Sequence, residues 1–323
     1  MKAVVIDEDN RPQWQDFETA VANADEVLIK VHATAINRAD LMQRQGVYPP
    51  PPGASPILGL ECAGEVVAVG ENCSRLNVGD RVCALLAGGG YAQFASAHEG
   101  SVLPIPDGLS FVEAASLPEV FATAWLNLFM EANLQPGEKV ILHAGASGVG
   151  TAAIQLCRSF GSATFITAGS DEKIRSCIEL GADAGFNRHQ GSFLEKAKEF
   201  AGDGGVNVVL DPVGGAYLKE NLKLLALNGR LVLIGLMGGA RAEIDLAALM
   251  MKRIRVIGST LRARPTSEKA QVMNQLFEKV WPKIESGEIR PIIDATFPIE
   301  KVVEAHDLVS SDATLGKVVL SVT

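Results

Sequence analysis

The sequence predicts an α/β fold in which a doubly wound parallel sheet is joined to a mostly β domain. Three observations support this prediction. Residues 139–156 read as a buried strand, a glycine turn and an opening helix, and strands then alternate with helices as far as about residue 259. The stretch from residue 2 to 118 instead shows short strands broken by turns. Alternating strands and helices are typical of a parallel sheet covered by helices on both faces.

Composition and charge narrow the class of protein. A chain of 323 residues with 47% apolar content is long enough for about two domains. The net charge is −9 and the two signs are mixed along the chain, which disfavours a nucleic-acid partner. No stretch approaches the roughly 20 apolar residues that a membrane span needs. We therefore expect an enzyme that acts on small molecules away from the membrane.

The five cysteines indicate a reducing compartment. Their number is odd and no Cys-x-x-Cys pair occurs, which argues against a disulfide framework and against a zinc knuckle. The N-terminus reaches Asp7 too early for a signal peptide. We expect a cytoplasmic protein with reduced thiols.

The elements of the first domain can be placed by their patterns. Glu26–Ala33 alternates apolar and polar residues, Ala63–Val69 has the same texture, and Asn77–Val82 is a turn that feeds another strand. From Phe111 to Leu134 the apolar spacing becomes helical. The dinucleotide-binding unit follows directly.

The glycine turn is the strongest functional signal. Gly145, Ser147, Gly148, Val149 and Gly150 separate an apolar strand from a helix. Such glycines let the main chain turn tightly and approach a pyrophosphate, whose charge then meets the free amides at the helix N-terminus. The spacing departs from the usual dinucleotide fingerprint, so a turn without a ligand is the alternative. The strand before and the helix after the turn favour dinucleotide binding.

The remaining elements follow in order. We expect strands at Ala163–Ala168, Asn207–Leu210, Arg230–Gly235 and Arg255–Ser259, and helices at Glu172–Leu180 (closed by Gly181), Ala216–Ala226 and Glu268–Ile284. The tail Pro291–Thr323 is rich in strand patterns, and we expect it to rejoin the first domain.

The end of the second parallel strand predicts the choice of cofactor. An acidic residue there would hydrogen-bond the ribose of NAD. Gly169 and Ser170 stand there instead, with Lys173 and Arg188 following. A hydroxyl and two cations can hold the 2′-phosphate of NADPH, which we therefore expect as cofactor. Asp171 and Glu172 lie close enough in sequence to leave NADH open as the cofactor. The alternative for the two cations is that they are solvated surface charges.

Six stretches together resemble one family over nearly the whole chain: Ala35–Gly46, Pro50–Ser55, Leu58–Glu61, His143–Leu156, Ala182–Asn187 and Gly235–Gly239. The sequence resembles the zinc-independent NADPH:quinone oxidoreductase branch of the medium-chain dehydrogenase/reductases, within the subgroup of the tumour-suppressor-inducible quinone oxidoreductase. This resemblance implies a GroES-like, partly open β-barrel catalytic domain (residues 1–120 and 290–323) and a Rossmann domain (residues 121–289). It also implies an active site where the two domains meet.

The resemblance further implies that the metal site of the zinc-dependent relatives is missing. Their zinc ligands would fall in the motifs Ile36–Asn37 and Leu60–Glu61 and near Glu119–Phe121, and these residues do not provide the thiolate and imidazole ligands of a catalytic zinc. We therefore expect no metal and no Lewis acid, so neutral donors must assist the reaction. The five histidines show no spacing typical of a metal site and are expected to be structural or surface residues.

The family motifs place Asn37 and Tyr48 beside the nicotinamide. An amide and a phenol hydroxyl can each donate a hydrogen bond to an oxygen on which negative charge grows. The alternative role of Asn37 is to cap a turn, and that of Tyr48 is to pack on its proline-rich loop. Thr123 and Ser147 match positions that touch cofactor in the family, and their alternative role is to cap helices. Main-chain groups of Leu236 and Met237 are expected to hold the carboxamide of the nicotinamide.

Three functions remain open. The first is an NADPH-dependent quinone reductase, with release of semiquinone possible in this subgroup. The second is a reductase of enones or 2-alkenals. The third is a non-catalytic, crystallin-like protein that binds NADPH. For assembly, the family implies a homodimer, and the strand at Arg255–Thr260 is the candidate edge for joining two sheets.

Overall fold

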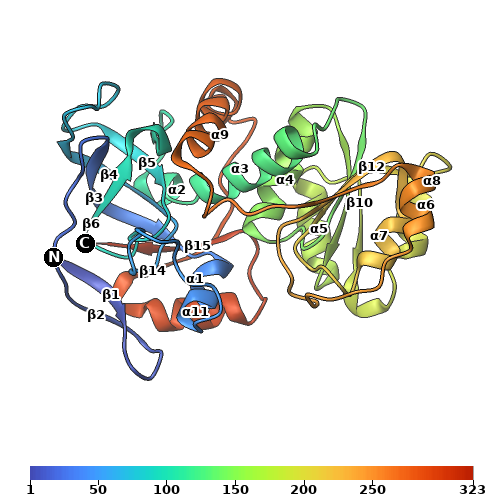
Figure 1. Ribbon diagram of the computed structural model, residues 1–323, viewed down its shortest axis with the longest axis horizontal. Helices are drawn as coiled ribbons and strands as arrows, with labels where there is room; N and C mark the ends of the chain where they lie inside the picture. The colour runs from blue at the N-terminus through green and yellow to red at the C-terminus, as the bar shows by residue number, and fades with distance from the viewer. Residues whose placement is uncertain (323) are drawn as a thin grey trace. The chain divides into compact units, whose positions relative to one another are not determined.

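The computed structural model describes residues 1–322 as two compact units, which we treat separately (Figure 1). The first unit contains Met1–Ala122 and the chain from Leu261 onward, and the second contains Thr123–Thr260. The C-terminal tail belongs to the first unit. Its last residue, Thr323, lies outside the described residues. No helix among residues 1–322 combines the length and apolar character needed to cross a membrane.

The second domain boundary lies near residue 260, whereas the family resemblance predicts it near residue 290. The difference concerns α9 (Thr266–Lys279) and α10 (Trp281–Glu285), which pack on the first unit. Trp281 is buried there, and its Nε1 donates to the carbonyl of Pro104 at 2.8 Å. Helical periodicity gives the apolar face of such a helix but not the domain that covers this face.

The first unit is built on a mostly antiparallel sheet that the C-terminal tail completes, and within it β14 and β15 pair in parallel. Its strand order is β14-β15-β3-β4-β5-β7, with β6 also paired to β3, and β1 and β2 form a separate hairpin. The strands are β1 (Lys2–Ile6), β2 (Pro12–Asp16), β3 (Glu26–Ala35), β4 (Glu61–Val69), β5 (Arg81–Leu85), β6 (Phe94–His98), β7 (Val102–Pro104), β14 (Ile293–Pro298) and β15 (Lys317–Ser321). The helices, besides α9 and α10, are α1 (Arg38–Arg44), η1 (Glu99–Ser101), α2 (Phe111–Ala114), η4 (Ile299–Lys301) and α11 (Val302–Ser310).

Helix α3 (Pro118–Trp125) carries the chain from the first unit into the second and continues as the π-helix η2 (Leu126–Glu131). The helical texture predicted for Phe111–Leu134 is therefore divided into α2, α3 and η2. A π-helix is rare and leaves the i→i+4 hydrogen-bond pattern, so apolar spacing alone does not predict it.

The second unit is a Rossmann domain. Its six strands are all parallel, in the order β10-β9-β8-β11-β12-β13, with helices on both faces of the sheet (Figure 1). The strands are β8 (Lys139–Leu142), β9 (Ala163–Ala168), β10 (Ala184–Asn187), β11 (Val206–Asp211), β12 (Leu225–Leu233) and β13 (Arg255–Gly258). The helices are α4 (Gly148–Ser159), α5 (Asp171–Leu180), η3 (Arg188–Gln190), α6 (Leu194–Ala201), α7 (Leu218–Leu224) and α8 (Leu246–Lys252). The predicted doubly wound sheet and the GroES-like unit are both confirmed.

Several element boundaries differ from the prediction. The helix expected at Ala216–Ala226 is the shorter α7, because β12 already begins at Leu225. The helix expected at Glu268–Ile284 is interrupted at Val280, since Pro282 has no amide hydrogen and its ring would clash inside a continuous helix. The tail contains the helix α11 between its two strands. The apolar residues of α11 pack in the core of the first unit, whereas the sequence pattern predicts a strand-rich tail.

Candidate active site, unit by unit

In the second unit, the glycine turn has the geometry of a phosphate cradle. The Ser147 side chain caps α4 by accepting from the amide of Gly150 at 3.1 Å, and the Gly145 amide donates to the carbonyl of Thr167 at 2.9 Å. A Cβ atom on Gly150 would lie only 2.4 Å from the Gly145 carbonyl oxygen. Gly148 and Val149 form the first turn of α4, where the amides are not used within the helix. These residues fit a dinucleotide pyrophosphate.

The turn also contains a residue in an unfavourable backbone conformation. Ala144 has φ +53°, a left-handed backbone conformation that residues other than glycine rarely adopt. Strain of this kind persists where surrounding structure fixes it, and it is common at ligand sites. Here the carbonyl of Ala144 accepts from the amide of Ser147 at 2.9 Å, which holds the turn closed.

The end of β9 gathers the residues predicted to select the cofactor. The guanidinium of Arg188 lies next to Gly169, since a Cβ atom on Gly169 would be 3.6 Å from both Nε and Nη2 of Arg188. Ser170 caps α5 by accepting from the backbone amide of Lys173 at 3.2 Å. The fold thus brings Arg188, which follows β10, beside Gly169 at the end of β9.

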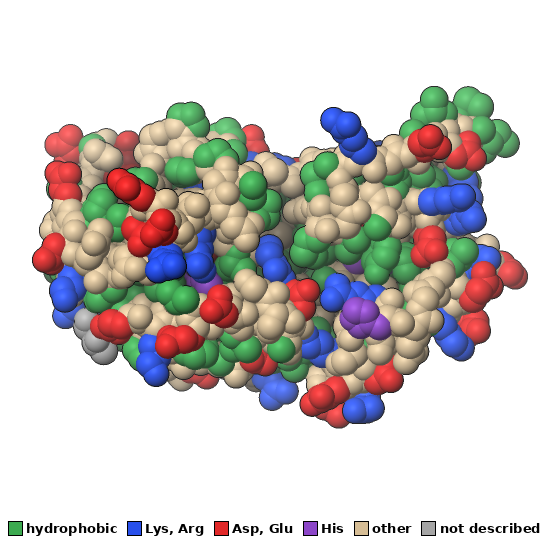
Figure 2. All heavy atoms as spheres, turned by 90° about the horizontal axis from the view of Figure 1, so that it is seen from below, with side chains coloured by type: hydrophobic (Ala, Val, Ile, Leu, Met, Phe, Trp, Pro, Cys, Tyr) green, Lys and Arg blue, Asp and Glu red, His purple; other side chains and the backbone are tan. Residues whose placement is uncertain are grey.

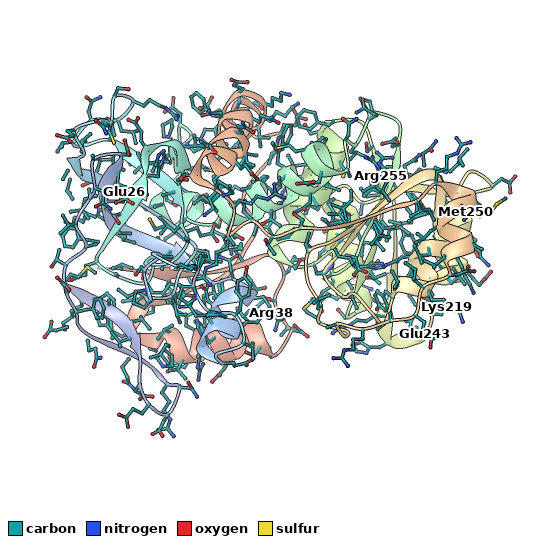
Figure 3. All side chains as sticks on the ribbon, viewed as in Figure 1. Glu26, Arg38, Lys219, Glu243, Met250 and Arg255 are labelled. Carbon is teal, nitrogen blue, oxygen red and sulfur yellow. The ribbon has the colours of Figure 1, made fainter. Side chains whose placement is uncertain are left out.

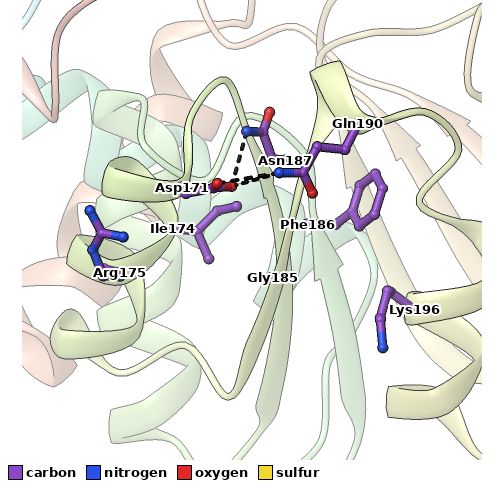
Figure 4. Close-up of a pocket in the computed structure, with 8 residues that line it drawn as sticks. All are labelled: Asp171, Ile174, Arg175, Gly185, Phe186, Asn187, Gln190 and Lys196. Atoms are coloured by element: carbon purple, nitrogen blue, oxygen red, sulfur yellow. Dashed lines mark hydrogen bonds between the residues drawn. The ribbon is translucent and has the colours of Figure 1, made fainter.

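The acidic side chain of Asp171, which directly follows Ser170, is hydrogen-bonded to two other side chains. Asp171 accepts from the amide groups of Asn187 (3.0 Å) and Gln190 (3.2 Å), and all three residues line a pocket of about 310 Å³ (Figure 4). Ile174 and Phe186 line the same pocket. The carboxylate that could have bound the ribose of NADH is therefore held by two side-chain amides.

A buried polar chain beneath the turn was not predicted. His143 lies between Thr167 Oγ1 (3.0 Å from Nδ1) and Asn221 Oδ1 (2.8 Å from Nε2), and Asn221 in turn donates to Asp211. Burial lowers the pKa of His143, against the opposing effect of the Asp211 charge. This chain ties the carboxyl ends of β8, β9 and β11 together. The expectation of a structural role fits this position of His143.

Two loops at the same edge of the sheet are joined by main-chain hydrogen bonds. The amide of Met237 donates to the carbonyl of Pro212 at 3.2 Å, and that of Gly238 donates to Val213 at 2.7 Å. Leu236 and Met237 are both more than half exposed. Thr123 lies in α3, where its carbonyl accepts from the side chain of Asn127 at 2.7 Å.

In the first unit, the motifs in which the family resemblance implies a metal site contribute to a buried ion-pair network. Glu61 is fully buried, and its Oε1 accepts from Lys317 Nζ at 2.7 Å and from Asn37 Nδ2 at 2.9 Å. Its Oε2 accepts from the amide of Glu119 at 2.9 Å. Lys317 also donates to Asn37 Oδ1 at 2.7 Å. The network therefore joins β4, α1, α3 and β15 through one carboxylate.

This network does not fit a zinc ion. The ammonium group of Lys317 already compensates the charge of Glu61, and the neighbouring positions carry an amide (Asn37) and an alkyl side chain (Leu60). Zinc sites in proteins use thiolate, imidazole and carboxylate ligands. Among residues 1–322, no cluster of three or more such side chains is placed to hold a metal ion.

Asp40 connects this network to a second buried chain. Its carboxylate accepts from the amides of Asn37 (2.8 Å) and Gly59 (3.0 Å) and from the hydroxyl of Tyr91 (3.1 Å). The Tyr91 hydroxyl also lies 3.3 Å from His306 Nε2. Burial raises the pKa of Asp40 to about 6, although its hydrogen bonds oppose this shift, and burial lowers the pKa of His306 to about 4. No sequence pattern predicts this chain, because its members come from four distant segments.

Tyr48 lies in the proline-rich loop after α1 and is partly buried. The guanidinium carbon of Arg262 is 5.5 Å from the centroid of its ring. Burial raises the pKa of the Tyr48 phenol, the Arg262 charge lowers it, and the Glu119 charge raises it. Asn37 and Tyr48 are therefore both in the first unit, where Asn37 belongs to the ion-pair network and Tyr48 stands beside a buried cation.

Comparisons with known proteins agree with this architecture. Residues 23–107 match the alcohol dehydrogenase GroES-like domain, and residues 148–279 match the zinc-binding dehydrogenase domain. Quinone oxidoreductase of Rattus norvegicus is 33% identical over 326 residues, covering 99% of this chain and 97% of the relative.

Two solved structures are similar over almost the whole chain. Escherichia coli quinone oxidoreductase complexed with NADPH has a TM-score of 0.86 at 28% identity, covering 99% of this chain and 98% of that one. CurK enoyl reductase has a TM-score of 0.85 at 30% identity, covering 100% and 99%. The chain therefore belongs to the medium-chain dehydrogenase/reductase family and is an oxidoreductase.

Proposed function

We propose that the protein is an NADPH-dependent quinone reductase that works without zinc. The observation that carries this proposal is the Glu61–Lys317–Asn37 network, which includes Asn37 and Glu61 from the motifs in which the family resemblance implies zinc ligands. Without a Lewis acid, the favoured acceptor is one that needs little polarisation. A quinone is such an acceptor, because it is electron-poor and gains an aromatic ring on reduction. The similarity to named quinone oxidoreductases supports the same choice.

NADPH is the proposed cofactor. Gly145, Ser147, Gly148, Val149 and Gly150 would hold the pyrophosphate at the N-terminus of α4. Gly169, Ser170, Lys173 and Arg188 would receive the 2′-phosphate, with the Arg188 guanidinium placed beside Gly169. Main-chain groups of Leu236 and Met237 would orient the nicotinamide, and Thr123 would contact it. Bound there, NADPH would supply a hydride to the acceptor.

Tyr48 and Asn37 are the proposed catalytic residues. As negative charge grows on the acceptor oxygen, the Tyr48 hydroxyl donates its proton to that oxygen and is later reprotonated from solvent. The Asn37 amide nitrogen donates to Glu61 at 2.9 Å and to the Ala35 carbonyl at 3.3 Å. Asn37 can assist the reaction by giving up the longer hydrogen bond, to Ala35, and donating to the acceptor oxygen instead. The main proton donor is therefore Tyr48.

A second candidate function is reduction of enones or 2-alkenals. The similarity to CurK enoyl reductase at 30% identity over the whole chain favours it. Hydride transfer to an enone also places negative charge on an oxygen, so the same phenol donor would serve.

One experiment tests these assignments. Purified protein should oxidise NADPH with 1,2-naphthoquinone or 1,4-benzoquinone, more slowly with NADH, and only weakly with alkenals. Tyr48→Phe should lower kcat by roughly 10²-fold, a value typical of losing a general acid. Arg188→Ala should reduce the preference for NADPH over NADH. Turnover of alkenals alone would move the protein to the second function. No turnover, together with stabilisation by NADPH, would identify a non-catalytic binding protein.

The protein is also proposed to form a homodimer through β13, at the edge of the Rossmann sheet. The helix before this strand in the chain, α8, carries three apolar side chains that are unusually exposed: Leu246 (70%), Met250 (72%) and Met251 (73%). Figure 2 shows hydrophobic side chains gathered at one end of the second unit, and Figure 3 labels Met250 at this end.

We further propose a cytoplasmic location, since all five cysteines are free thiols.

A further inference from the structure

We propose that Arg262 is a positioning residue that clasps the Tyr48 loop and holds the phenol in place as the proton donor. This inference rests on the proposed function for the role of Tyr48. It concerns a residue that none of the sequence motifs included, in the segment that follows the second unit.

The loop that carries Tyr48 has little packing of its own. Its glycines Gly46 and Gly53 have φ of +74° and +82°, and a Cβ atom on either would meet no heavy atom within 4 Å. The residues around Tyr48 are largely exposed. A catalytic phenol in such a loop needs an external anchor, because a misplacement of about 1 Å can cost roughly 10²-fold in rate.

Arg262 provides this anchor from a buried position, with only 4% of its surface exposed. Its Nη2 donates to Gln43 Oε1 at 2.6 Å, its Nε donates to the Ala87 carbonyl at 2.8 Å, and its Nη1 lies 3.5 Å from the Tyr48 carbonyl. Gln43 in turn donates to the carbonyl of Pro56 at 2.9 Å. The planar guanidinium fork thereby ties the loop to α1 and to the chain after β5, which a single ammonium group could not do.

Arg262 also acts on the phenol itself. Its guanidinium carbon is 5.5 Å from the Tyr48 ring centroid, within the range of a cation–π contact. Its charge opposes the rise in the Tyr48 pKa that burial and the Glu119 charge cause. The same side chain therefore fixes the position of the phenol and keeps its hydroxyl a better acid.

The test is a double-mutant cycle on kcat with a quinone acceptor. Arg262→Met should lower kcat about tenfold in the wild-type background while leaving the KM for NADPH within about twofold, and it should have almost no effect in the Tyr48→Phe background. An equal loss in both backgrounds, or no loss in either, would show that Arg262 does not act through Tyr48. Arg81→Met is the matched control, since Arg81 also lies over an aromatic ring (Phe111, 4.6 Å) and donates to a carbonyl (Leu109, 3.0 Å).

A second measurement does not depend on turnover. Hydrogen–deuterium exchange of peptides that cover residues 45–57 should be faster in Arg262→Met than in the wild type, and unchanged in Arg81→Met. Unchanged exchange in Arg262→Met would overturn the clasp. If the wild-type protein reduces no acceptor, the proposed function fails, whereas the exchange data still decide whether Arg262 holds the loop.

Discussion

Lys317 illustrates how one side chain governs the buried polar network of the first unit. Its ammonium group is 4% exposed and lies 2.7 Å from the fully buried carboxylate of Glu61. Two charges removed from water are tolerated only when they are paired and hydrogen-bonded, a condition that Asn37 and the amide of Glu119 complete. Removing one partner leaves the other charge buried and uncompensated.

We therefore expect Lys317→Met to lower the free energy of unfolding by about 3–5 kcal/mol. Urea unfolding followed by circular dichroism measures this change. Adding Glu61→Gln to the variant removes the orphaned charge and should restore part of the loss, whereas Lys301→Met, at an exposed position, should change stability little. A Lys317→Met protein as stable as the wild type would show that the ion pair contributes nothing to the fold.

The shifted pKa values of Asp40 and His306 lead us to expect two opposing effects of pH on stability. The folded pKa of Asp40 is about 6, above its ordinary 3.8, so the folded state binds more protons and stability falls as the pH rises from about 4 to 6. The folded pKa of His306 is about 4, below its ordinary 6.5, so stability rises with pH through about 4 to 6.5. Each effect amounts to about 3 kcal/mol, and the two nearly cancel.

Single substitutions should separate the two effects. Relative to the wild type, Asp40→Asn should make stability rise more steeply with pH between 4 and 6, and His306→Gln should make it fall. Chemical unfolding at several pH values in this window gives both slopes. Slopes of the same sign in the two variants would contradict the assignment of one buried acid and one buried base to the Tyr91 chain.

Among the elements, α4 and the turn before it depend on the absence of a side chain at Gly150. A Cβ atom there would lie 2.4 Å from the Gly145 carbonyl oxygen and 2.5 Å from that of Ala144. Both contacts are with backbone, so the start of the helix would have to move. The amides that form the cradle would move with it.

Gly150→Ala should accordingly weaken NADPH binding at least about tenfold and cost roughly 1–3 kcal/mol of stability, the range for overpacked sites. Isothermal titration with NADPH and thermal unfolding measure the two effects. Gly204→Ala is the control, because a Cβ atom on Gly204 would meet no heavy atom within 4 Å. Unchanged NADPH affinity in Gly150→Ala would place the dinucleotide elsewhere.

The elements also show where sequence patterns are sufficient and where they fail. The match is close for β9 and α5, because apolar strands and capped helices are set by local chemistry. The residue pattern of the tail predicts strands, yet the tail contains α11, whose apolar residues pack in the core of the first unit. A short helix between two strands is stabilised by the tertiary contacts of its apolar face, which local periodicity does not report.

At the scale of the whole molecule, the proposed homodimer gives a direct prediction. Val256 in β13 is 39% exposed, and β13 is an edge strand of the sheet. Val256→Asp should place a charge in the joined sheets and convert a species of twice the 34.2 kDa chain mass into monomer, as measured by light scattering after gel filtration. Val303→Asp, at a similar exposure in α11, should leave the mass unchanged. A wild-type protein that elutes as a monomer would end this proposal.

The sequence by itself determined the parallel sheet, the glycine turn and the residues around Gly169, because each depends on neighbours within one strand–turn–helix unit. Only the tertiary structure decided which charges meet. Lys317 binds Asn37 across 280 positions of the chain, and Arg262 reaches the Tyr48 loop across 214. Contacts over such separations are set by how the tail and the segment after the second unit pack on the first unit, and no local pattern of residue types records that packing.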